Sequence, residues 1–162
     1  LNRGARRIAF LGDASQPEIG LRHAGYLQAH RDRDLLASSP PVSHVLQELH
    51  DPTPFLDHLL KTDPAIDAFF VSSDVEAMRV INALRSLGRR VPEDILVAGY
   101  DDIAMAAHFH PSLTTVSQSA DIAGGAMIDA LSALLDGKTP ASVRLPTHLQ
   151  ARASSASGQA DL

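Results

Sequence analysis

The stretch VSSDVEAMRVINALRSLGRRVPEDILVAGYDD, residues 71–102, carries the strongest pattern in this chain of 162 residues. In its first half, apolar residues recur at the spacing of one helix face: Ala77, Val80, Ile81, Leu84 and Leu87. Gly88 follows as a helix stop, and the run ILVAG, residues 95–99, has the length and composition of a buried strand. The stretch therefore predicts a helix and then a strand, with two aspartates just beyond the end of the strand.

Strand and helix patterns alternate along the rest of the chain. Further strands are predicted within residues 8–11, 42–49, 66–74, 113–118 and, limited to a sheet edge by Pro146, 143–150. Further helices are predicted at residues 17–31, 53–61 and 121–135. Apolar strands that alternate with helices predict an α/β fold, a parallel-sheet three-layer sandwich with helices on both faces. Residues 151–162, ARASSASGQADL, are small and polar, so we expect a disordered tail there.

Composition excludes several classes of protein. With 44% hydrophobic and 20% charged residues, the chain is typical of a globular domain. A net charge of -5 argues against binding of nucleic acid by this chain alone, because phosphate binding needs clustered Lys and Arg. The absence of Cys excludes disulfides and fits a reducing compartment, so we expect a cytoplasmic protein. No apolar run approaches the ~20 residues of a membrane span, and no secretory signal is visible.

Polar residues collect where the predicted strands end: Gly12-Asp13, Asp51-Pro52, Ser72-Ser73-Asp74 and Tyr100-Asp101-Asp102. In open parallel sheets the ligand lies beyond the carboxyl ends of the strands. Buried carboxylates are costly unless they are paired. An acidic edge of this kind therefore indicates a ligand that is positively charged or donates hydrogen bonds.

Four phrases, in their order and spacing, resemble the effector-binding domain of LacI/GalR-type transcriptional repressors. They are GLRHAGY at 20–26, SSDVEAM at 72–78, VPEDILVAGYDD at 91–102 and PSLTTVSQ at 111–118, and the similarity extends over roughly residues 7–152. The resemblance implies a type I periplasmic-binding-protein-like fold, in which two α/β lobes enclose a ligand cleft. Residues 7–117 would form the C-terminal lobe, and residues 118–150 would be a crossover helix and strand of the N-terminal lobe. Most of the N-terminal lobe and the DNA-binding headpiece would be absent from this sequence.

The implied function is effector sensing. A small molecule, with a sugar as first expectation, would bind between the lobes and change the affinity of the headpiece for operator DNA. The protein would be a homodimer without a cofactor. The alternative is a sugar-binding protein of a transport system with the same fold, which would need a secretory signal.

The resemblance also implies the residues that bind the effector. Arg22 and Asp101 match the ligand-contacting arginine and aspartate of the family. The pairing is chemically sensible, because a carboxylate accepts hydrogen bonds from vicinal hydroxyls and a guanidinium donates in a planar fork. Gln118 matches a crossover position near the cleft, and Gln16 and Glu18 are candidate specificity positions.

Other positions depart from the family pattern or have local roles. Ser73 stands where several relatives have an asparagine, and because its side chain is shorter, we expect any contact with ligand to be lost or water-mediated. Pro52 stands where many relatives have a stacking aromatic ring, which puts stacking recognition in doubt. Asp74 is expected to cap the helix that follows it, and Asp102 to accept from the backbone within its own turn.

The dimer surface implied by the resemblance contains Met78, Asn82, Met105 and Phe109, although Met78 and Phe109 would equally suit the core.

Neither a metal site nor catalysis is indicated. His108 and His110 lack a third ligand at a defined spacing, so a surface or interface position is expected for both. The first strand is not followed by a G-x-G-x-x-G or G-x-x-x-x-G-K-[ST] phosphate loop. A phosphoacceptor receiver domain would carry its acidic pair after the first strand, whereas here the pair follows the fourth. With no nucleophile–base couple, we expect a protein that is not an enzyme.

Overall fold

The computed structural model describes residues 4–33, 42–45 and 51–156. The elements occur in the order β1 (Ile8–Leu11), α1 (Pro17–Asp32), β2 (Val42–His44), α2 (Thr53–Thr62), β3 (Ala68–Val71), α3 (Asp74–Ser86), β4 (Leu96–Ala98), α4 (Ala104–His108), β5 (Thr115–Ser117), α5 (Ala120–Leu135), β6 (His148–Gln150) and a 3-10 helix, η1 (Ala153–Ser155). Strand and helix alternate as the sequence predicts. The second half of the predicted strand at 42–49 lies largely outside the described residues.

The central sheet is parallel, with strand order β2-β1-β3-β4. Ile8 pairs with Ala68, and Phe69 pairs with Val97. A parallel bridge from Ala98 to Thr114 brings β5 beside β4, and β5 then pairs antiparallel with β6. The predicted parallel-sheet α/β fold is thus confirmed, with a two-stranded ribbon at its edge.

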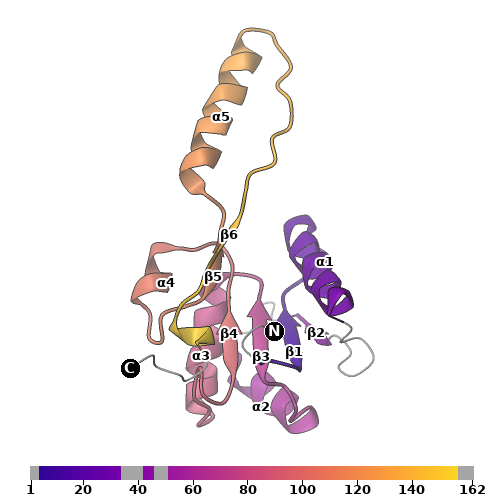
Figure 1. Ribbon diagram of the computed structural model, residues 1–162, viewed down its shortest axis with the longest axis vertical. Helices are drawn as coiled ribbons and strands as arrows, with labels where there is room; N and C mark the ends of the chain where they lie inside the picture. The colour runs from indigo at the N-terminus through magenta and orange to yellow at the C-terminus, as the bar shows by residue number, and fades with distance from the viewer. Residues whose placement is uncertain (1–3, 34–41, 46–50, 157–162) are drawn as a thin grey trace.

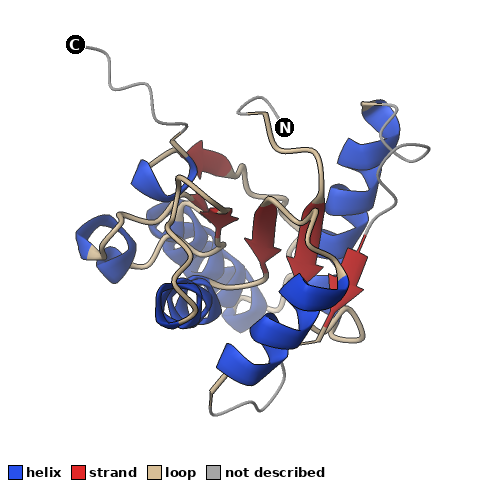
Figure 2. Cartoon of the chain, turned by 90° about the horizontal axis from the view of Figure 1, so that it is seen from below, coloured by secondary structure: helices blue, strands red, loops and turns tan. Residues whose placement is uncertain are grey.

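Helices cover both faces of this sheet, and Figure 2 shows the strands lying between them. Alternate side chains of a strand point to opposite faces, so each strand contributes to two layers. One face packs on α2 and α3 and holds most of the fully buried apolar residues: Ala9, Leu11, Leu56, Phe69, Val71, Val80, Ile81, Leu84 and Val97. On the other face, Phe10 packs against His23 and Tyr26 of α1, at centroid distances of 5.0 and 5.7 Å. Burying each large apolar side chain contributes about 1.5–3 kcal/mol.

The segment between β5 and β6 extends away from the sheet (Figure 1). Its helix α5 has no buried residue, although it carries exposed apolar side chains: Ile122, Met127, Ile128, Leu131, Leu134 and Leu135. A helix with an apolar surface gains its stability by packing against another element. The assignment of residues 118–150 to a second lobe stays a prediction.

The chain returns to the sheet after β6, and here the expectation of a disordered tail is wrong for residues 151–156. Ser154 is fully buried, and its Oγ donates to the carbonyl of Val97 at 2.7 Å and accepts from the amide of Thr114 at 2.9 Å. Small polar side chains are typical of disorder, but these satisfy backbone groups at the edge of the sheet. Residues 157–162 lie outside the described residues.

Among the residues that the structure describes, no helix is both long enough and apolar enough to cross a membrane.

Candidate functional site

The structure brings Arg22 and Asp101 together, although 79 positions separate them in the sequence. Arg22 lies on α1, and Asp101 follows β4 at the carboxyl edge of the sheet. Arg22 Nη2 lies 3.4 Å from Asp101 Oδ1, and the two side chains are 14% and 31% exposed. This is the juxtaposition that the resemblance implies.

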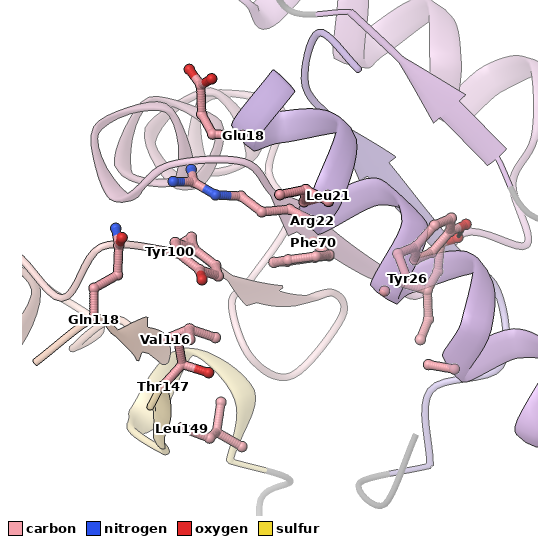
Figure 3. Close-up of a pocket in the computed structure, with 13 residues that line it drawn as sticks. Glu18, Leu21, Arg22, Tyr26, Phe70, Tyr100, Val116, Gln118, Thr147 and Leu149 are labelled. Carbon is pink, nitrogen blue, oxygen red and sulfur yellow. Dashed lines mark hydrogen bonds between the residues drawn. The ribbon is translucent and has the colours of Figure 1, made fainter. Parts of the chain in front are cut away.

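Arg22 is held in place by two further contacts. Its Nη1 donates to the carbonyl of Ser72, which follows β3. Its guanidinium also lies over the ring of Tyr100, 4.0 Å from the centroid, where a cation–π attraction contributes about 0.5–2 kcal/mol. Figure 3 shows Arg22, Tyr100 and Gln118 at one side of a hollow beside α1. The guanidinium is therefore preorganised by the protein.

The two carboxylate oxygens of Asp101 differ in their hydrogen bonds. Gln118 Nε2 donates to Oδ1 at 2.7 Å, and Arg22 approaches the same atom. Within the described residues, Oδ2 accepts no hydrogen bond. Burial raises the pKa of Asp101 and the nearby charge of Asp74 adds to this, while Arg22 and Gln118 act in the opposite direction. A half-buried carboxylate oxygen with no donor is suited to accept a hydrogen bond from a ligand.

The backbone at this point is strained. Asp101 has φ 115°, which only glycine adopts freely, and Asp102 has φ 54°, a left-handed value that Asp and Asn adopt more readily than other non-glycine residues. Each such residue costs on the order of 1–3 kcal/mol, and strain of this kind is concentrated at functional sites. The amide of Asp101 donates to the carbonyl of Val116 at 3.0 Å, and the amide of Asp102 to Thr115 Oγ1 at 3.2 Å.

Asp102 does not have the local role that the sequence predicts. Its carboxylate pairs with Arg152 at 2.7 Å, across 50 positions of sequence, instead of accepting from its own turn. The expected role of local backbone acceptor is therefore wrong.

Asp74 was expected to cap α3, and this expectation is also wrong. Ser73 is the N-cap and accepts from the amide of Glu76 at 3.3 Å. Asp74 is fully buried and accepts from the amide of Ile103 at 2.9 Å and from Thr115 Oγ1 at 2.5 Å. A Cβ atom at Gly99 would clash with this carboxylate, so the glycine leaves the space that Asp74 fills. Asp74 thus stabilises the strained turn through its hydrogen bonds with Ile103 and Thr115.

A pocket of about 390 Å³ opens between the loop after β1, the first turn of α1 and the start of α3. The candidate residues Gln16, Glu18, Arg22, Ser73 and Asp101 line it, together with Gly12, Asp13, Ile19, Ser72 and Glu76. Its size lies within the range of small-molecule sites.

A second hollow, about 770 Å³, shares Glu18 and Arg22 with this pocket and includes Gln118 (Figure 3). Pro52 lies apart from the residues that line these two hollows, buried at the start of α2.

The predicted interface residues fall into two groups. Met78 and Phe109 are partly buried against the core, whereas Asn82 and Met105 are exposed. His108 and His110 flank the end of α4, and no group of three or more potential metal ligands occurs in the described part of the chain.

Several residues of the site were not predicted as site residues from the sequence, among them Ser72, Tyr100, Thr115 and Arg152. Ser72 contributes a carbonyl, which no side-chain pattern reveals. Tyr100 directly precedes the acidic pair, and this adjacency was the available signal. Thr115 and Arg152 act through partners distant in the sequence, so no local pattern identifies them.

Comparisons with known proteins identify the family to which the chain is similar. A family model described as a periplasmic binding protein-like domain matches residues 1–155. The HTH-type transcriptional regulator CelR of Thermobifida fusca is 35% identical over 161 residues, covering 95% of this chain and 46% of CelR. Transcription regulator GntR from Chromobacterium violaceum has TM-score 0.81 at 32% identity, covering 95% of this chain and 58% of that chain. A CelR–cellobiose complex has TM-score 0.72 at 32% identity, and the match covers 94% of this chain and 48% of that chain. The chain spans about half the length of the curated relatives it matches.

Proposed function

The chain belongs to the periplasmic-binding-protein-like family, in the form found in LacI/GalR-type regulators, and we propose that it senses a small hydroxylated effector for such a regulator. The observation that carries the proposal is the Arg22–Asp101 pair, which lies at the carboxyl edge of the sheet with one carboxylate oxygen free. A sugar hydroxyl would donate to Asp101 Oδ2, and the fixed guanidinium of Arg22 would donate to a ligand oxygen.

The charges around the pocket disfavour an anionic effector. Its lining contains four carboxylates, those of Asp13, Glu18, Glu76 and Asp101, and one guanidinium, that of Arg22. Glu76 is paired with Arg79 at 2.7 Å, and Asp13 accepts from Ser15, so part of this negative charge is already bonded. The remaining field would repel a phosphate or a carboxylate and tolerate neutral hydroxyls. We therefore propose a neutral sugar as the effector class, and cellobiose is the sugar present in the CelR–cellobiose complex.

The site would be completed by a second lobe. Residues 7–117 would form one lobe, and residues 118–150 would pack into the other. The exposed apolar side chains of α5 support this assignment, because they have no buried contact within the described residues. Effector binding across the gap would favour one arrangement of the lobes, and a coupling of about 1–3 kcal/mol to DNA binding is typical of such switches.

The regulator is favoured over a transport protein because the curated relatives are transcriptional regulators. The full-length protein would act in the cytoplasm, bind operator DNA through a headpiece outside this sequence, and catalyse no reaction.

We further propose that it is a homodimer through a surface containing Met78, Asn82, Met105 and Phe109. Met105 is 57% exposed, so Met105→Asp tests this surface without disturbing the core. Light scattering at tens of micromolar should give a dimer for the wild type and a monomer for the variant. A monomeric wild type would exclude the dimer.

Thermal-shift measurements on the full-length protein test the effector site. Cellobiose and lactose should raise the melting temperature, whereas glucose 6-phosphate should not. A ligand at 100 times its Kd stabilises the folded state by about 2.7 kcal/mol, which is readily detected. Hypoxanthine and guanine serve as chemically different comparison ligands. No shift with any sugar, or a shift unchanged in Asp101→Ala, would exclude the proposed site.

A further inference from the structure

The strained turn at Asp101 and Asp102 requires a support, because two consecutive non-glycine residues there have positive φ. Such conformations persist only where surrounding contacts enforce them. Asp101 is the residue proposed to bind the effector, so the contacts that hold the turn also set the direction of its carboxylate.

Arg152 makes the contact best suited to this role. Its Nη2 donates to Asp102 Oδ1 at 2.7 Å, and its Nη1 donates to the carbonyl of Leu113 at 2.8 Å. Its own backbone is fixed, because its amide donates to Thr114 Oγ1 at 2.8 Å and its carbonyl accepts from the same hydroxyl at 2.9 Å. The side chains of Arg152 and Asp102 are only 21% and 19% exposed, so the ion pair is largely shielded from water.

We propose that Arg152 is a positioning residue for the effector site. It holds Asp102 in the left-handed conformation and thereby directs the Asp101 carboxylate toward the pocket. The inference deepens the proposed function and rests on it, since it assigns a role to a residue that does not line the pocket.

The location of Arg152 gives this role a regulatory consequence. Gln118 directly follows β5 and contacts Asp101, while Arg152 lies just after β6 and contacts Asp102. The whole projecting segment, residues 118–150, lies between these two contacts in the chain (Figure 1). A movement of β5 and β6 would therefore change both of these contacts with the turn. Since coupling between sites is reciprocal, an effector bound at Asp101 would in turn bias the position of this segment.

The first test needs no ligand. Amide hydrogen exchange is measured by NMR in the full-length protein, at the amides of Asp101 and Asp102. Arg152→Ala should accelerate exchange at these amides about ten-fold or more, because the strained conformation loses its support. The matched control is Arg7→Ala, which removes an ion pair of the same length, 2.7 Å, and similar exposure, 22% and 23%, at Asp63. Equal exchange at Asp101 in both variants would overturn the proposal and leave Arg152 with a general stabilising role.

The second test separates conformation from charge. Gly and Asn adopt positive φ at little cost, and Ala does not. Cellobiose affinity, measured by calorimetry, should therefore remain within about three-fold of wild type in Asp102→Gly and Asp102→Asn but fall about ten-fold in Asp102→Ala. Equal losses in all three variants would show that only the ion pair matters and would overturn the proposal.

Two further variants make the tests decisive. Arg152→Lys keeps the charge but not the planar fork, and should give an intermediate exchange rate; it also replaces Arg152→Ala if that variant does not fold. Adding Arg152→Ala to Asp102→Gly should have no further effect on exchange at Asp101. If cellobiose and lactose fail to bind the wild type, the proposed function fails, while the exchange measurement still decides the role of Arg152.

Discussion

Asp101→Asn is the substitution that separates effector binding from folding most cleanly. The amide is nearly isosteric with the carboxylate, so the contacts that hold aspartate at φ 115° can hold asparagine in the same conformation. Its oxygen can still accept from Gln118 and Arg22, so the local structure should be retained. The amide nitrogen then takes the place of Oδ2, so the charged acceptor becomes a neutral donor, and an effector hydroxyl can only accept a hydrogen bond from it.

The magnitude follows from the kind of hydrogen bond. A hydrogen bond to a charged group contributes about 1.5–3 kcal/mol, and one between neutral groups about 0.5–1.5 kcal/mol. The difference is about 1–2 kcal/mol for one effector hydroxyl at Oδ2. At about 1.4 kcal/mol per ten-fold change, the Kd for a sugar should rise about 5- to 30-fold.

The stability of the variant should not fall with the affinity. Burial raises the pKa of Asp101 in the folded state above its ordinary value. The folded state therefore binds the proton more tightly than the unfolded state, and stability decreases as the pH rises from the unfolded pKa through the folded pKa. At neutral pH the wild type carries this cost and the amide does not. Asp101→Asn should accordingly melt at the same or a higher temperature at pH 7, and this advantage should shrink as the pH falls through the folded pKa of Asp101 and be absent below about pH 4.

Calorimetric titration with cellobiose or lactose, and thermal melts from pH 3.5 to 8, measure both effects in the full-length protein. Asp63→Asn is the control, because Asp63 is a similarly exposed aspartate paired with Arg7 away from the site. Asp63→Asn should leave the affinity for cellobiose and lactose unchanged. A Kd for Asp101→Asn within two-fold of wild type would refute a direct contact with the effector.

Three further substitutions test the packing that supports the site, each by denaturant unfolding. Gly99→Ala should lower the free energy of unfolding by about 1–3 kcal/mol, because the added methyl group meets the buried Asp74 carboxylate; an unchanged midpoint would contradict this packing. Asp74→Ala should cost about 3 kcal/mol, since it leaves the Ile103 amide and the Thr115 hydroxyl without their acceptor, and a loss below 1 kcal/mol would be inconsistent with that role. Ser73→Ala should lower the free energy of unfolding by about 1 kcal/mol, because α3 loses its N-cap hydrogen bond. No measurable change would contradict the role of Ser73 as the cap.

The fold was predictable because it rests on hydrophobic periodicity. Apolar strands of the type IAFL and helices with one apolar face specify the layers, and strand-end polar residues specify the edge where ligands bind. The sheet rule predicted the position of Asp101 at this edge, whereas the approach of Arg22 to Asp101 was implied by the resemblance to LacI/GalR-type regulators.

The errors concern contacts that depend on distant parts of the chain. Both Ser73 and Asp74 can cap a helix, and the choice between them is made by the space that Gly99 leaves. The partner of Asp102 is 50 residues away, in a segment whose composition is typical of disorder. That segment is ordered because its short polar side chains satisfy backbone groups of β4 and of the residues before β5, a match that composition does not encode.

A crystal structure of the full-length protein with cellobiose or lactose bound tests the central claim most directly. The account predicts sugar hydroxyl oxygens within about 3.2 Å of both Asp101 Oδ2 and a guanidinium nitrogen of Arg22, in a gap closed by a second lobe. A sugar bound elsewhere, or an edge of the sheet covered by the protein's own side chains so that no ligand reaches Asp101, would contradict it.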